Sequence, residues 1–158
     1  MNRSKENIQA SVLDRLIDNE PGVSHEPVQR RLVDIGQLKA VVARDIENLL
    51  NTKRQIIIPP AACKEVSSSL YNYGLADFTS QNPKSPTVRQ QLRQDIEKTI
   101  SKFEPRLRNV SIQFENPTKA ERHLRFRIVG LLVVDPVTEP VTFDTFFDVN
   151  KGEYVISK

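Results

Sequence analysis

Residues 85–114, SPTVRQQLRQDIEKTISKFEPRLRNVSIQF, contain the change from helix to strand that sets the class of fold. Apolar side chains recur at helical spacing through residues 86–103, which predicts a helix with one buried face. Ser85 can cap this helix, and Pro86 suits its first position. Pro105 ends it, because the residue before a proline disfavours the α region. Residues 110–114 then alternate between apolar and polar, as in a strand with one wet face.

A second strong helix is predicted before this stretch, over residues 35–50. Its apolar residues follow the i, i+3, i+4, i+7 pattern of one helical face. Asp34 and Gln37 have the spacing of a capping box at its start. A shorter helix begins near Val12, with its apolar residues on one stripe, and Pro21-Gly22 follow it. Residues 19–33 then form a predicted linker.

The residues after the opening stretch predict strands. Residues 122–134 form a long run, apolar on one face in its first half and on both faces from Val129 to Val134. A third strand covers residues 141–147, where a break in the alternation predicts a bulge, and Tyr154 to Ile156 form a last short strand. Helices followed by hairpins indicate an α+β fold, an antiparallel meander in the C-terminal half with helices on one face. We expect a flexible polar tail over residues 1–10 and a single domain over residues 11–158.

The segment between the two main helices is harder to assign. Ile56-Ile57-Ile58, followed by two prolines, is either a buried edge strand or a loop packed on the core. Residues 61–70 have the composition of a short helix. Asn72-Tyr73-Gly74-Leu75 predicts a turn in which Gly74 takes a positive φ.

Composition bounds the functions that this chain can have. Its 158 residues fit one domain, and 23 Lys and Arg against 20 Asp and Glu give a net charge of +3. This near balance disfavours nucleic acid as a partner. The single cysteine, Cys63, fits a reducing compartment. No apolar run reaches the ~20 residues of a membrane helix, and the N-terminus does not resemble a secretory signal, so we expect a cytoplasmic protein without direct membrane insertion.

Chemistry is sparse in this sequence. No cofactor loop or metal-spaced cluster is present, so we predict neither a cofactor nor a metal site. The best enzymatic alternative is a peptidoglycan glycosidase using Glu104 and Asp77, since such enzymes need two carboxylates some 5–10 Å apart. Arg106, however, favours an ionised Glu104, whereas a general acid must hold a proton. Glu104 and Arg106 are more simply explained as an ion pair at the end of a helix.

Four stretches together resemble TssE, a subunit of the type VI secretion baseplate, and its relatives, the small wedge proteins of contractile phage baseplates. The stretches are SVLDRL at 11–16, RDIENLLNTK at 44–53, SLYNYGLADF at 69–78 and FEPRL at 103–107. Two positions depart from the family's usual pattern: Lys53 stands where Arg is usual, and Ala76 where Pro is usual. Beyond Phe114 the resemblance is one of pattern only.

The resemblance implies a structural role without catalysis. It implies a place in the baseplate wedge beside TssF, TssG and TssK, in a baseplate docked at the inner membrane. It also implies contact with the first ring of the contractile sheath, built from TssB and TssC, whose assembly such a subunit templates. Glu104, Pro105 and Arg106 form the E-P-R motif, which is expected to face the wedge core and bind partners. We predict that the C-terminal sheet, with a free edge for strand addition, is the docking surface for the sheath.

Overall fold

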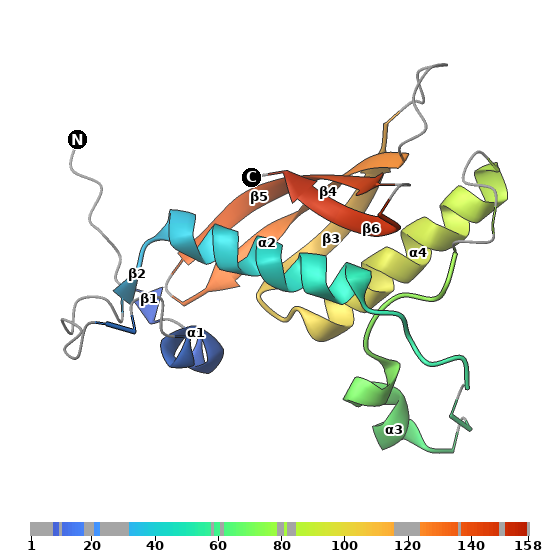
Figure 1. The fold of residues 1–158 in the computed structure, drawn as a ribbon, viewed down its shortest axis with the longest axis horizontal. Helices are drawn as coiled ribbons and strands as arrows, with labels where there is room; N and C mark the ends of the chain where they lie inside the picture. Colours follow the sequence, from blue (N-terminus) through green and yellow to red (C-terminus); the bar gives the residue numbers. More distant parts are fainter. Residues whose placement is uncertain are drawn as a thin grey trace.

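The computed structural model describes residues 8–9, 11–17, 21–22, 32–57, 59–60, 62–78, 81, 85–115, 124–135, 137–148 and 151–157. Two long helices, α2 and α4, cross one face of a four-stranded sheet (Figure 1). The helices are α1 Val12–Leu16, α2 Ile35–Asn51, α3 Lys64–Ser68 and α4 Pro86–Phe103, with a 3-10 turn at Leu70–Asn72. The strands are β1 Ile8–Gln9, β2 Leu32–Val33, β3 Leu107–Phe114, β4 Leu124–Val134, β5 Val137–Asp148 and β6 Glu153–Ser157.

The main sheet is an antiparallel meander in the order β3-β4-β5-β6. Strands β4 and β5 pair along their whole common length, from Leu124 opposite Phe147 to Val134 opposite Val137. The short strands β1 and β2 form a separate antiparallel pair. The predicted α+β class, with helices before a meander and on one of its faces, is confirmed.

The core lies between the sheet and the two long helices. Helix α2 buries six side chains along one face: Leu38, Val42, Ala43, Ile46, Leu49 and Leu50. Helix α4 buries Leu92, Ile96 and Ile100. These meet the inward residues of β4, of which Phe126 and Ile128 are at most 1% exposed. Both predicted helical periodicities therefore mark buried faces.

Helices α2 and α4 begin at the residues that the sequence predicted. Asp34 and Gln37 form a complete capping box, in which Gln37 N–H donates to Asp34 Oδ1 at 2.7 Å and Asp34 N–H donates to Gln37 Oε1 at 3.0 Å. Ser85 occupies the N-cap position of α4 with Pro86 behind it, but the Ser85 hydroxyl makes no capping hydrogen bond. The capping predicted for the Ser85 side chain is therefore wrong.

The predicted bulge in the third strand is also wrong. Strand β5 pairs in continuous register with both neighbours. The alternation looks broken in the sequence because Thr145, which is 3% exposed, occupies an inward position that an apolar residue usually takes. The register shift lies instead in β3, between Arg108 and Ser111, where Asn109 has a φ of 53°.

Several apolar residues outside the main sheet are exposed. Ile56 is 93% and Ile57 is 73% exposed, so this run is neither a buried strand nor a loop packed on the core, and both of those expectations are wrong. The apolar stripe of α1 is also exposed. Residues 8–9, at the end of the predicted tail, form β1; the rest of that tail, Ile58 and most of the predicted linker lie outside the described residues. No helix within the described ranges is both long and apolar enough to cross a membrane.

The segment between α2 and α4 closes at a narrow neck. Leu75 N–H donates to the Thr52 carbonyl at 2.9 Å, and Arg54 N–H donates to the Leu75 carbonyl at 2.7 Å. Gly74 has a φ of 97°, as predicted, and a Cβ at this position would lie 2.1 Å from the Thr52 carbonyl oxygen. The neck therefore requires glycine both for its backbone angle and for space. Helix α3 lies within residues 61–70, for which the sequence left helix, strand and loop open.

Helix side chains cover parts of both outer edges of the sheet. Asn51 bonds the Tyr154 backbone on β6 twice, accepting from its N–H at 2.7 Å and donating to its carbonyl at 2.8 Å. Glu47, one turn earlier on α2, accepts from Ile156 N–H at 3.3 Å. On β3, Ile112 N–H donates to Glu97 of α4 at 2.9 Å.

Candidate interaction site

The E-P-R motif forms the corner between α4 and β3. Glu104 is the C-cap of α4, and its N–H donates to the Ile100 carbonyl at 2.8 Å. Leu107 N–H then donates to the Glu104 carbonyl at 3.1 Å, which closes the turn around Pro105. The Arg106 carbonyl accepts from Val133 N–H of β4 at 2.8 Å. The corner is thus fixed by backbone bonds before its side chains interact.

Glu104 and Arg106 form a bidentate ion pair within this corner. Arg106 Nε donates to Glu104 Oε1 at 2.6 Å and Arg106 Nη2 to Oε2 at 2.5 Å, and the Arg106 backbone N–H also donates to Oε1 at 3.2 Å. Glu104 is only 4% exposed, whereas the Arg106 side chain is 24% exposed. The ion pair that the sequence favoured for this helix end is confirmed. The assignment of Glu104, Pro105 and Arg106 to partner binding stays a prediction.

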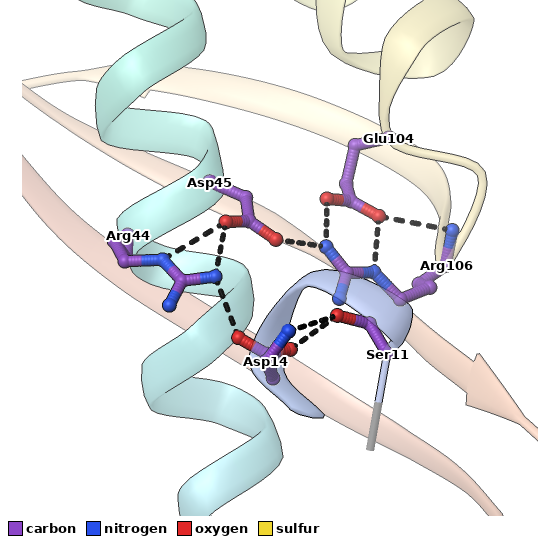
Figure 2. A network of polar contacts seen from close by, with 6 residues as sticks. All are labelled: Ser11, Asp14, Arg44, Asp45, Glu104 and Arg106. Carbon is purple, nitrogen blue, oxygen red and sulfur yellow. Dashed lines mark hydrogen bonds and ion pairs between the residues drawn. The ribbon is translucent and has the colours of Figure 1, made fainter. Parts of the chain in front are cut away.

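The ion pair continues into a network that joins three elements (Figure 2). Arg106 Nη2 donates to Asp45 Oδ2 of α2 at 2.6 Å, and Arg44 Nη2 donates to Asp45 Oδ1 at 2.8 Å. Arg44 Nη2 also reaches Asp14 Oδ1 of α1 at 2.8 Å. Ser11, the N-cap of α1, accepts from Asp14 N–H at 3.2 Å. The network therefore runs from the first helix through α2 to the corner.

The charges of the network shift several pKa values. Hydrogen bonding to Glu104 raises the pKa of Arg106 against the opposing effect of burial. Burial opposes ionisation of Asp14, but hydrogen bonds from Ser11 and Arg44 together lower the pKa of Asp14. Burial and the negative charges of Asp45 and Glu104 raise the pKa of the nearby Tyr73. Three carboxyl groups and two guanidinium groups thus lie within hydrogen-bonding distance of one another in a partly buried network.

Helix α1 depends on this network because none of its residues is buried. Val12, Leu13 and Leu16 are 64%, 59% and 76% exposed. The Asp14–Arg44 ion pair, at 2.8 Å, joins α1 to α2. The network thus positions an apolar helical surface beside the E-P-R corner.

The network shows which residues sequence reasoning missed. Asp14, Arg44 and Asp45 were not predicted as site residues, although each lies in a stretch that carries the family resemblance. Arg44 lies outside the apolar face of α2, where a charged side chain is usually solvated. The adjacent Arg44-Asp45 pair on a half-buried helix was the available indication, since buried charges require partners.

The structure does not bring the two glycosidase candidates together. Asp77 forms an exposed ion pair with Lys53 at 3.1 Å and lies beside the first half of α4, near Leu92. Glu104 follows the end of that helix, about 18 Å beyond Leu92 at 1.5 Å per residue. Both carboxylate oxygens of Glu104 are bonded to Arg106. Within the described ranges, no group of three or more His, Cys, Asp or Glu could hold a metal ion.

Besides the outer edges of β3 and β6, one further stretch of open edge lies in the C-terminal hairpins. Strand β4 is paired on both sides, so it offers no edge. Strand β6 pairs with β5 only from Asp144 to Asp148, and its last paired residue is Ser157. Among the described strands, the part of β5 before Asp144 therefore has β4 on one side and no strand on the other. Of strands β4 and β5, only β5 therefore has an open edge that could serve the predicted docking.

The fold and site define an α+β protein whose buried charges are used to join its own elements. A family model described as "Baseplate wedge protein gp25" matches residues 36–137, most of the chain. The chain therefore belongs to the baseplate wedge protein gp25 family, which confirms the resemblance to baseplate wedge proteins. The match contains Asp45, Glu104 and Arg106, whereas α1 lies outside it.

Two further comparisons complete this result. One chain of a solved structure, "The baseplate complex from the type VI secretion system", is similar at 18% identity over 70% of this chain and 94% of that chain, with a TM-score of 0.47. No curated protein matches the sequence.

Proposed function

We propose that this chain is a TssE-like protein, a non-catalytic structural subunit of a type VI secretion baseplate wedge. Membership in the baseplate wedge gp25 family is the observation that carries this proposal. The four stretches that resemble TssE favour a secretion baseplate over a phage baseplate. The chain then acts in the cytoplasm, in a baseplate docked at the inner membrane, with TssF, TssG and TssK as its wedge partners.

The E-P-R corner is the proposed contact with the wedge core. Glu104 is buried, and both of its carboxylate oxygens accept hydrogen bonds from Arg106, so its role is to hold the guanidinium group in place. Pro105 is exposed and the Arg106 side chain is partly exposed, so these two present the surface that a partner meets. Arg106 already uses Nε and Nη2 for Glu104 and Asp45, so a partner would meet the exposed part of a guanidinium group that these two carboxylates hold in place. The exposed apolar residues of α1 extend this surface.

The proposed sheath contact is the free edge of β5. A strand from TssB or TssC that continues the line of β6 would pair with β5 before Asp144. Main-chain hydrogen bonds supply the affinity in such strand addition. Pro140 lies in this segment, and proline in a sheet is placed where its missing N–H faces an open edge. This position supports an edge that is not paired within the subunit.

Thr142→Pro tests this proposal. Alternate residues of a strand face the same edge, so Thr142 has the orientation of Pro140, and the variant removes a donor from the free edge. We expect Thr142→Pro to co-purify with TssF and TssG and to melt within a few degrees of the wild type, while sheath polymerisation from the baseplate falls sharply. Thr142→Ala is the matched control and should polymerise sheath normally. A folded Thr142→Pro variant that still supports sheath growth would contradict the templating role, and a wild-type chain that does not co-purify with the wedge subunits would contradict the proposal as a whole.

A further inference from the structure

The outer edge of β6 is occupied by side chains of helix α2. Strand β6 pairs with β5 on one side, and among the described strands none lies on its other side. Tyr154 N–H donates to Asn51 of α2, so it points away from β5. Alternate residues of a strand direct their backbone groups to the same edge, and Ile156 N–H likewise donates to α2, at Glu47. Both N–H groups that β6 directs outward are therefore bonded within the chain.

Asn51 binds β6 as a residue of a neighbouring strand would. In an antiparallel pair, two opposite residues exchange N–H and carbonyl bonds. The Asn51 side chain makes the same exchange with Tyr154, because Oδ1 accepts from its N–H at 2.7 Å and Nδ2 donates to its carbonyl at 2.8 Å. Glu47, one helical turn earlier, takes the next outward N–H, that of Ile156, at 3.3 Å. An added strand would have to displace both side chains before it could pair with β6.

Without these side chains, β6 would be complementary to the same strand of a second copy. About a two-fold axis at Val155, Tyr154 of each copy lies opposite Ile156 of the other. Because these are the residues that direct their backbone groups outward, each copy offers the donors and acceptors that the other needs. Val155, whose side chain is half-buried, would then lie opposite its own counterpart. Uncovered edges of this kind pair with other chains.

We propose that Glu47 and Asn51 form an edge cap that prevents β6 from pairing with a second copy of this chain. The edge cap keeps the subunit monomeric. It gives a role to two residues of the stretch at 44–53, in which Arg44 and Asp45 belong to the network around the E-P-R corner. The inference goes beyond the proposed function and does not depend on it, since it concerns the isolated chain.

The test removes the edge cap from the full chain and measures self-association by sedimentation equilibrium. Glu47→Ala combined with Asn51→Ala should form a dimer at least about tenfold more tightly than the wild type, because the freed backbone groups regain hydrogen bonds in the second copy. Asn48→Ala, on the exposed side of the same helix, is the matched control and should behave like the wild type. Glu47→Gln keeps an oxygen that can accept from Ile156 N–H, so it should also behave like the wild type.

A further substitution locates the dimer contact. Val155→Lys, added to the double variant, places two lysine side chains opposite each other across the two-fold axis, and like charges in that position destabilise a strand pair. The triple variant should therefore be monomeric. In the double variant, hydrogen exchange at the Tyr154 and Ile156 amides should slow as the dimer fraction rises.

Two results would overturn the inference. One is a folded double variant that associates no more tightly than Asn48→Ala, and the other is a dimer that persists after Val155→Lys. Circular dichroism shows whether each variant is folded. If the double variant does not fold, Asn51→Ala alone frees both backbone groups of Tyr154, and the same two results decide.

Discussion

Arg106→Ala is expected to destabilise the fold strongly, because it leaves a buried carboxylate without its main partner. Glu104 is 4% exposed and accepts two side-chain hydrogen bonds from Arg106. Removing one member of a buried ion pair costs about 3–5 kcal/mol of unfolding free energy. Asp45 keeps its bond to Arg44, so the loss is concentrated on Glu104. Against a typical stability of 5–15 kcal/mol, this loss is large.

Urea denaturation followed by far-ultraviolet circular dichroism measures this loss. Lys53→Ala is the matched control, because the Lys53 and Asp77 side chains are 65% and 50% exposed and such a pair contributes about 0–1 kcal/mol. The double variant Glu104→Ala with Arg106→Ala removes both charges, so its cost should be smaller than the sum of the two single losses. The coupling energy from this cycle should be at least about 1 kcal/mol.

An Arg106→Ala loss below about 1 kcal/mol, equal to that of Lys53→Ala, would refute the reasoning. It would mean that the ion pair contributes no more to the free energy of unfolding than a surface pair does. In that case the motif would act entirely in assembly. If Arg106→Ala loses the expected unfolding free energy, its assembly into the wedge has to be compared with that of the wild type at a temperature where the variant is still folded.

Two further predictions concern the sheet. Thr145 is buried, and its Oγ1 has no hydrogen-bond partner among the described residues. Thr145→Val should therefore raise the unfolding free energy by about 1 kcal/mol in the same urea assay. An unchanged or lower unfolding free energy would show that the Thr145 hydroxyl does have a hydrogen-bond partner. Burial, with the charge of Asp95, raises the pKa of Tyr154 to about 12 from an unfolded value near 10. The folded state thus favours the neutral phenol, and this contribution is present below pH 10 and is lost as the pH rises toward 12. Between those values the wild type should lose up to about 3 kcal/mol more stability than Tyr154→Phe, and equal losses would contradict the shift.

The parts of the fold that sequence predicted are those set by local chemistry. The two long helices follow from apolar periodicity, and the start of α2 follows from the short-range pairing of Asp34 with Gln37. The positive φ of Gly74 follows from its place in a turn. In each case the residues that determine the structure lie within a few positions of one another, so a single sequence contains the necessary information.

The parts that sequence could not predict depend on contacts between distant segments. Arg106 and Asp45 are 61 positions apart, and Arg44 and Asp14 are 30 apart, so spacing gave no indication of the network. The local contacts of the network, such as Glu104–Arg106 and Arg44–Asp45, were within reach of sequence reasoning, but the contacts that join the elements were not. The exposure of Ile56 was missed for a different reason, since a β-branched run is equally compatible with a strand and with an apolar surface segment.

Side chains of the two long helices cover parts of the outer edges of the sheet. Glu47 and Asn51 are one helical turn apart, about 6 Å along α2, and Ile156 and Tyr154 are two strand residues apart, about 7 Å along β6. This match lets one helix face occupy the backbone of β6 as a neighbouring strand would. Glu97 of α4 takes the Ile112 N–H on the opposite edge. Exposed edges invite pairing with other chains. If a strand is added as proposed, the segment of β5 before Asp144 can take it in line with β6, and that strand has to accommodate the ion pair at 3.0 Å between Lys39 of α2 and Glu139 of β5.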